Sequence, residues 1–124
     1  QKQNTMKKTY NMEDRLVQFA GEIILYCNKL PNHNTGRYYS DQMVRSAGSS
    51  ALNYGEAQGT VTEKDFINKM SLVLKELKET KVSLKILDYV KYGEEQKRKF
   101  LLQESQELAA ISATMILNKK RSQK

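Results

Sequence analysis

The segment from Phe66 to Val90, FINKMSLVLKELKETKVSLKILDYV, decides the fold. Apolar side chains recur along it at spacings of three, four and seven residues, at Phe66, Met70, Val73, Leu77, Leu84 and Leu87. Such spacing lines one face of an α-helix, and Thr80 is its one interruption. The pattern predicts a long amphipathic helix whose apolar face is buried.

Turn-forming residues on either side set the limits of this helix. Thr62 followed by Asp65 resembles a capping box, and Gly93 is suited to end a helix. We therefore expect a helix over residues 63–92. After it, apolar residues seven apart predict a last helix over residues 94–118.

Two more helices are predicted upstream. Apolar residues three and four apart predict a helix over residues 13–30, which ends before a proline. Residues 31–39 read PNHNTGRYY, a run of turn formers that we interpret as a loop. Ser40 can then cap a helix over residues 41–58.

The composition agrees with a single helical domain. The chain has 124 residues, of which 39% are hydrophobic, one is proline and six are glycine. Four helices joined by short connections predict an all-α fold, an antiparallel up-down left-handed four-helix bundle over residues 13–118. Residues 1–12 are expected to form a flexible N-terminal segment, and residues 119–124 a basic C-terminal tail.

Charge and cysteine content limit the class of protein. Lysine and arginine exceed aspartate and glutamate by seven, so the surface attracts polyanions. The lone cysteine, Cys27, lies on the apolar face of its helix and is expected to be buried and inert. No apolar run is long enough to span a membrane. We expect a cytoplasmic protein with no membrane partner.

Two glycines within the expected helix 41–58 provide evidence on how this helix packs. Gly48 and Gly55 each destabilise a helix interior by about 1 kcal/mol relative to alanine. Their presence indicates close approach of a neighbouring helix or of another subunit.

Three segments of the second and third helices resemble a known family. They are QMVRSAGSSALNYGEA at 42–57, DFINKM at 65–70 and LKELKET at 74–80, followed by Leu84. They resemble the bacterial four-helix-bundle family of 23S ribosomal RNA intervening-sequence proteins, related to accessory proteins of retroelements, from about Arg15 to Val90. The resemblance implies a ring-like homopentamer without assigned catalytic residues, and an association with RNA.

The polar residues in these helices have a structural interpretation. Side chains on successive turns can pair across the helix interface and fix its register, and this structural polar network comprises Arg45, Asn53, Glu56, Glu76 and Glu79. A carboxylate metal site is the alternative, but it needs Glu-x-x-His pairs, and the one histidine, His33, lies in the expected loop. We expect no metal, no cofactor and no catalytic residues.

Basic and aromatic residues are the candidates for nucleic-acid binding. They comprise Lys75, Lys78, Lys81 and Lys85, then Lys97 and Arg98, and the Arg37, Tyr38 and Tyr39 cluster of the expected loop. A solvated face balanced by glutamates, and tyrosines that cover the bundle ends, are the alternatives.

Two functions therefore stay open. The first is a non-enzymatic homo-oligomer that binds nucleic acid, RNA in particular, through repeated basic surfaces. The second is a scaffold whose oligomer binds a protein partner without nucleic acid, indicated by the small residues of the second helix.

Overall fold

The computed structural model describes residues 11–123, and this part of the chain contains four α-helices and no strand. The helices are α2 (Met12–Cys27), α3 (Asn34–Gln58), α4 (Glu63–Tyr89) and α5 (Glu95–Ser122). The expected flexible segment 1–12 falls almost wholly outside the described residues, and Met12 is already helical.

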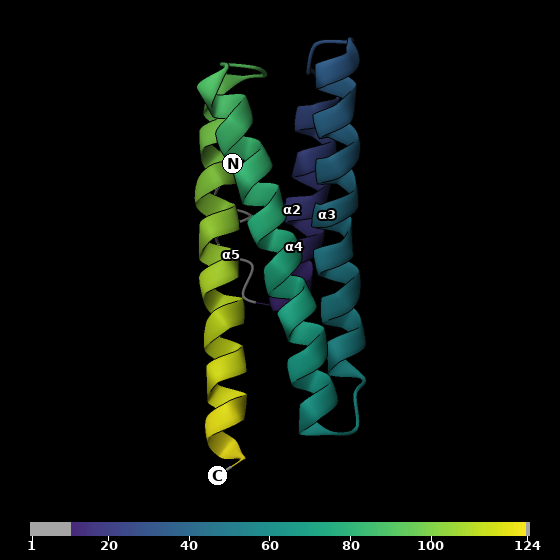
Figure 1. Cartoon of the computed structure of the whole chain (residues 1–124), viewed down its shortest axis with the longest axis vertical. Helices are drawn as coiled ribbons and strands as arrows, with labels where there is room; N and C mark the ends of the chain where they lie inside the picture. Colours follow the sequence, from purple (N-terminus) through teal and green to yellow (C-terminus); the bar gives the residue numbers. More distant parts are fainter. Residues whose placement is uncertain (1–10, 124) are drawn as a thin grey trace.

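The helices pack side by side in chain order. Helix α3 packs against α4, α4 against α5, and α2 against both α3 and α5. Successive helices run in alternating directions along the long axis in Figure 1. These features confirm an all-α four-helix bundle and are compatible with the up-down topology, while the left-handed crossing stays a prediction.

The connection between α2 and α3 differs from the expected loop. Helix α2 ends at Cys27, and α3 begins at Asn34 rather than at residue 41, with His33 as its N-cap in place of Ser40. A Cβ atom on Gly36 would lie 1.8 Å from the carbonyl oxygen of Pro31. Glycine therefore lets the first turn of α3 pack on the connection. The turn-forming composition of residues 31–39 predicted a loop at these positions instead of a helix.

The other helix ends follow recognisable capping. The Thr62 side chain accepts a hydrogen bond from the backbone N–H of Asp65 at 3.0 Å, which confirms the predicted cap of α4. Helix α4 ends at Tyr89, three residues before the expected limit. Helix α5 continues to Ser122, so residues 119–122 are helical and do not form the expected tail.

The core combines apolar side chains with small hydroxyls. The seam residues Met70, Val73 and Leu77 are fully buried, as predicted. Thr80, which interrupts the seam, is also buried, and its hydroxyl lies 2.6 Å from that of Ser46 on α3. The Thr80 hydroxyl donates as well to the carbonyl of Glu76 at 2.9 Å, so the interruption is a satisfied polar contact between helices.

The lone cysteine behaves as expected. The side chain of Cys27 is buried at the end of α2. Burial raises the pKa of its thiol to about 11, so the thiolate is scarce at neutral pH. Cys27 is therefore a small apolar residue of the core.

Candidate nucleic-acid interface

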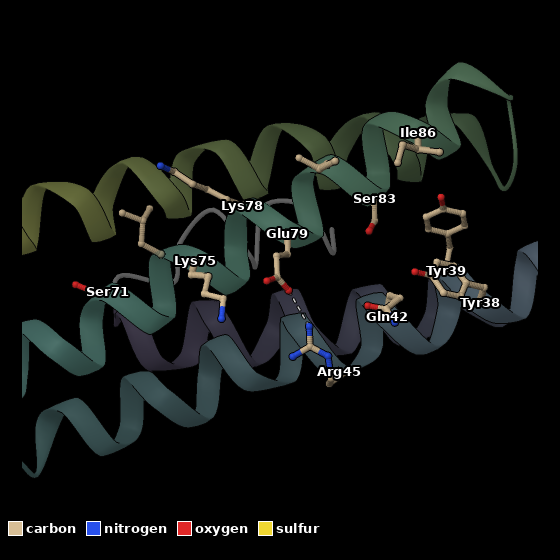
Figure 2. A pocket seen from close by; sticks show the side chains of 12 residues that line it. Tyr38, Tyr39, Gln42, Arg45, Ser71, Lys75, Lys78, Glu79, Ser83 and Ile86 are labelled. Carbon is tan, nitrogen blue, oxygen red and sulfur yellow. Dashed lines mark hydrogen bonds and ion pairs between the residues drawn. The ribbon is translucent and has the colours of Figure 1, made fainter.

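A groove runs between α3 and α4 and has a volume of about 910 Å³. Figure 2 shows Tyr38 and Tyr39 at one end near Ile86, Ser71 toward the other end, and Arg45 with Glu79 between them. Twelve residues line this α3/α4 groove: Tyr38, Tyr39, Gln42, Arg45, Ser71, Leu74, Lys75, Lys78, Glu79, Val82, Ser83 and Ile86. It gathers four of the predicted nucleic-acid contacts, the two tyrosines and two of the lysines.

An ion-pair network ties the two helices together at the middle of the groove. The guanidinium of Arg45 donates to Glu79 at 2.8 Å and to Glu76 at 3.2 Å. The hydrogen bond that Arg45 donates to Glu79 raises the pKa of Arg45, which therefore stays protonated. Arg45, Glu76 and Glu79 therefore pair across the interface between α3 and α4.

The two other predicted members of the network act elsewhere. Asn53 donates within α3 to the carbonyl and hydroxyl of Ser49, so its amide group is engaged inside its own helix. Glu56 accepts from Lys69 of α4 at 2.6 Å, in a separate ion pair. The prediction of one five-residue network was wrong, because these positions face different neighbours.

Lys75 and Lys78 are the available cations of the α3/α4 groove. Both side chains are exposed, and neither forms an ion pair with any residue from 11 to 123. The acidic lining residue, Glu79, is already paired with Arg45. A ligand with negative charge would therefore meet two ammonium groups and no free carboxylate in this groove.

The aromatic candidates lie on a helix instead of a loop. Tyr38 is 57% exposed, and its ring meets that of Tyr39 edge-to-face with centroids 5.0 Å apart. The Tyr39 ring thus supports one edge of the exposed Tyr38 ring beside the groove. Arg37 is not in the groove lining, because its guanidinium donates to the side-chain oxygens of Asn32 and Asn34.

The remaining basic candidates separate in space. Lys81 and Lys85 line a second groove, between α4 and α5. Lys97 pairs with Glu22 of α2. The prediction that Arg98 contacts nucleic acid was wrong: its side chain is 1% exposed and donates to Asp88 and to the Tyr92 carbonyl.

The buried guanidinium of Arg98 anchors the turn between α4 and α5. It also donates to the carbonyl of Gly93 at 3.0 Å, while the hydroxyl of Tyr26 donates to the Tyr92 carbonyl at 2.7 Å. Burial raises the pKa of Tyr26 to about 12, so the phenol keeps its proton. Lys97 and Arg98 are adjacent in the sequence but have different roles. One step along an α-helix rotates the direction of the side chain by over a quarter turn, so only Arg98 points inward.

An exposed apolar face lies on the outer side of α2 and α3. On each helix, apolar side chains and glycines recur three or four residues apart. They are Val17, Gly21, Ile24 and Leu25 on α2, and Val44, Gly48, Leu52 and Gly55 on α3. A Cβ atom on any of these glycines would meet nothing within 4 Å. Within the fold the glycines therefore do not admit a neighbouring helix, and the α2/α3 face is left unpartnered.

Sequence reasoning noted Gly48 and Gly55 but missed the apolar residues of this face, and it missed two polar lining residues of the groove, Gln42 and Ser83. The apolar residues of the face repeat with helical spacing on the side of each helix away from the core, and the sequence alone shows this repeat. Gln42 and Ser83 have no sequence signal, since their role depends on how α3 meets α4.

Metal and membrane sites find no support in the described part of the chain. Within residues 11–123, no three His, Cys, Asp or Glu side chains come together as a metal site would require. No described helix is both long and apolar enough to cross a membrane.

Known proteins with similar sequence or structure agree with this architecture. The model of the 23S rRNA-intervening sequence protein family matches residues 8–114. A similar crystal structure is that of a protein with unknown function from the S23 ribosomal protein family of Bacteroides thetaiotaomicron. The two sequences are 28% identical and the TM-score is 0.78. The match covers 86% of this chain and 98% of the Bacteroides chain. Among curated proteins, none matches the chain. A match over most of its length shows that the chain belongs to the family of 23S rRNA-intervening sequence proteins.

Proposed function

We propose that the protein is a non-enzymatic homo-oligomer that associates with RNA through the α3/α4 groove. The observation that carries this proposal is the presence of Lys75 and Lys78, free of ion pairs among the described residues, in the same groove as the exposed ring of Tyr38. Ammonium groups bind backbone phosphates, and exposed aromatic rings stack on unpaired bases. The groove thus favours a single strand, which offers both groups at once.

The α2/α3 face supports the oligomeric part of the proposal. Leu52 of this face is 71% exposed, and the neighbouring glycines permit a close approach of another backbone. Contact between copies would remove this apolar surface from water. A pentamer, as the resemblance implies, would repeat a chain of formal charge +7 and bind RNA multivalently.

The family connects the proposal with ribosomal RNA and with the cytoplasm. The family is named after intervening sequences of 23S rRNA. Ribosomal RNA is therefore the first ligand to test, and the cytoplasm, which contains the ribosomes, is the expected location.

The binding test uses a labelled single-stranded RNA and fluorescence anisotropy over a salt series. The wild-type protein is expected to bind with an affinity that falls steeply as salt rises. Lys75→Gln with Lys78→Gln is expected to lower the slope of log affinity against log salt by about 1.4, at about 0.7 for each lost phosphate contact. The matched control, Lys29→Gln with Lys64→Gln, removes the same charge at exposed positions outside the groove and is expected to keep the wild-type slope.

Light scattering tests the oligomer in the same samples. Leu52→Lys is expected to reduce the molar mass, since it places a charge in the α2/α3 face. Val61→Lys is the control, because Val61 is 96% exposed in the connection before α4. A wild-type monomer, or a Leu52→Lys variant of unchanged mass, contradicts the proposed interface.

A protein-interaction scaffold is the second candidate. It is favoured by the apolar lining residues Leu74, Val82 and Ile86, which could hold an apolar helix of a protein partner in the α3/α4 groove. A defined oligomer that binds no RNA at any salt concentration would favour the scaffold over the RNA-binding function.

A further inference from the structure

The α4/α5 groove lies on the opposite side of α4 from the α3/α4 groove and has a volume of about 470 Å³. Eight residues line it: Lys81, Lys85, Asp88, Tyr89, Lys99, Leu102, Gln103 and Gln106. Its one aliphatic lining residue is Leu102, whereas the α3/α4 groove has three aliphatic lining residues. The two grooves therefore differ in their lining residues, and the α4/α5 groove has fewer aliphatic ones.

Positive charge dominates this second groove. Lys81 and Lys85 are one helical turn apart, and neither forms an ion pair within residues 11–123. The carboxylate of Asp88 accepts from Arg98 at 2.7 Å and from Lys99 at 3.0 Å. Those hydrogen bonds, that of Arg98 first, lower the pKa of Asp88, so its charge is present but compensated by two cations.

The other polar groups suit the remainder of a nucleotide. The amide of Gln106 offers a donor and an acceptor, and Gln103 keeps its amide oxygen while its NH2 group donates to Glu107 at 2.9 Å, so both residues can match hydroxyl groups and base edges. Tyr89 is 87% exposed at the rim, where its ring is free to stack. A carboxylate ligand would use the lysines but leave these groups without a role.

The lysines of α4 also connect the two grooves. The helical period places Lys75 nearest α3, Lys78 and Lys85 on the outer surface, and Lys81 nearest α5. Cations thus follow one another round the exposed side of α4. A single strand that leaves the α3/α4 groove would meet them in turn, and the α4/α5 groove lies at the end of this path.

We infer that the α4/α5 groove is a phosphate-binding site, in which Lys81 and Lys85 hold phosphate groups and Tyr89 stacks on an adjoining base. In this role it holds the backbone of the strand whose bases occupy the α3/α4 groove, an assignment that rests on the proposed function. The same phosphate chemistry also fits a free polyphosphate ligand, and the experiment separates the two sources.

The first arm measures RNA binding by anisotropy across the salt series for Lys81→Gln with Lys85→Gln. Its slope of log affinity against log salt is expected to fall by about 1.4 relative to wild type, as expected for two lost contacts to a single strand. The Lys29→Gln, Lys64→Gln control keeps the wild-type slope. A wild-type slope in the Lys81, Lys85 variant, together with a reduced slope in the Lys75, Lys78 variant, overturns the inference and leaves the proposed function intact.

The second arm uses inorganic pyrophosphate as the probe and thermal unfolding as the readout. Wild type is expected to gain melting temperature with pyrophosphate, and the Lys81, Lys85 variant to gain none. If the wild-type protein binds no RNA, the proposed function fails. A pyrophosphate effect that depends on these lysines then supports a site for a free polyphosphate, whereas no effect in wild type overturns the phosphate site itself.

Discussion

Replacing Gly93 with alanine tests the contacts that hold the turn between α4 and α5. The backbone of Gly93 has φ of +82°, a region that disfavours any residue with a Cβ atom. A Cβ atom there would also lie 2.5 Å from Cε1 and 2.7 Å from the hydroxyl of Tyr26. The ring of Tyr26 must therefore move, and its 2.7 Å hydrogen bond to the Tyr92 carbonyl is lost.

The expected loss of stability follows from these contacts. The left-handed backbone costs about 1–2 kcal/mol for alanine, and the lost hydrogen bond about 1 kcal/mol. Alanine also restricts the unfolded chain, which offsets about 0.5–1 kcal/mol. Gly93→Ala is therefore expected to lower the free energy of unfolding by roughly 2 kcal/mol.

Urea unfolding followed by circular dichroism measures this change, at one protein concentration because the oligomer affects apparent stability. Gly59→Ala is the matched control: a Cβ atom there would meet its nearest neighbour, the Glu56 carbonyl, at 3.7 Å, an ordinary contact. The control is expected to stay within about 1 kcal/mol of wild type. Equal stability of Gly93→Ala and Gly59→Ala would refute the reasoning.

Three further predictions concern other contacts. Lys91→Gly is expected to raise the free energy of unfolding by about 1 kcal/mol in urea, since Lys91 has φ of +62° at the end of α4, and a loss would contradict this. Arg98→Met is expected to lower it by roughly 2–3 kcal/mol, because two carbonyls lose a charged donor, and unchanged stability would remove its anchoring role. The Cys27 thiol, with its pKa raised to about 11, is expected to react slowly with a disulfide reagent at pH 8 and quickly in urea. Because the unfolded thiol ionises first, Cys27 contributes stability at neutral pH that is lost as pH rises from about 9 to about 11. A fast reaction of the native protein with the disulfide reagent at pH 8 would contradict its burial.

The sequence predicted the helices well where the pattern is long and regular. The seam from Phe66 to Leu87 identified α4 and its buried face, and Thr62 marked its beginning. The beginning of α3 was missed, since a turn-forming composition predicts a loop, whereas glycine at position 36 lets the first turn of the helix pack closely on Pro31. Local propensity is a weak guide where tertiary packing decides.

The candidate site was predicted only in part. Periodicity placed Lys75 and Lys78 on the exposed side of their helix, the tyrosines were expected in a loop, and the structure brings all four into one groove. The sequence could not tell Arg98, which is buried, from its neighbour Lys97, because both are basic residues in the first turns of one helix. Only the position of Asp88 and the turn carbonyls decides that the guanidinium points inward.

The sequence by itself determined the class of fold, the helical segments, the buried faces and the positive charge of this protein. All of these depend on local spacing and composition, which a single helix already expresses. The tertiary structure alone decided which cations are paired, which stay available, and that two grooves with different lining residues lie on either side of α4. Pairing and grooves depend on how two helices meet, and residues far apart in the sequence determine that contact together.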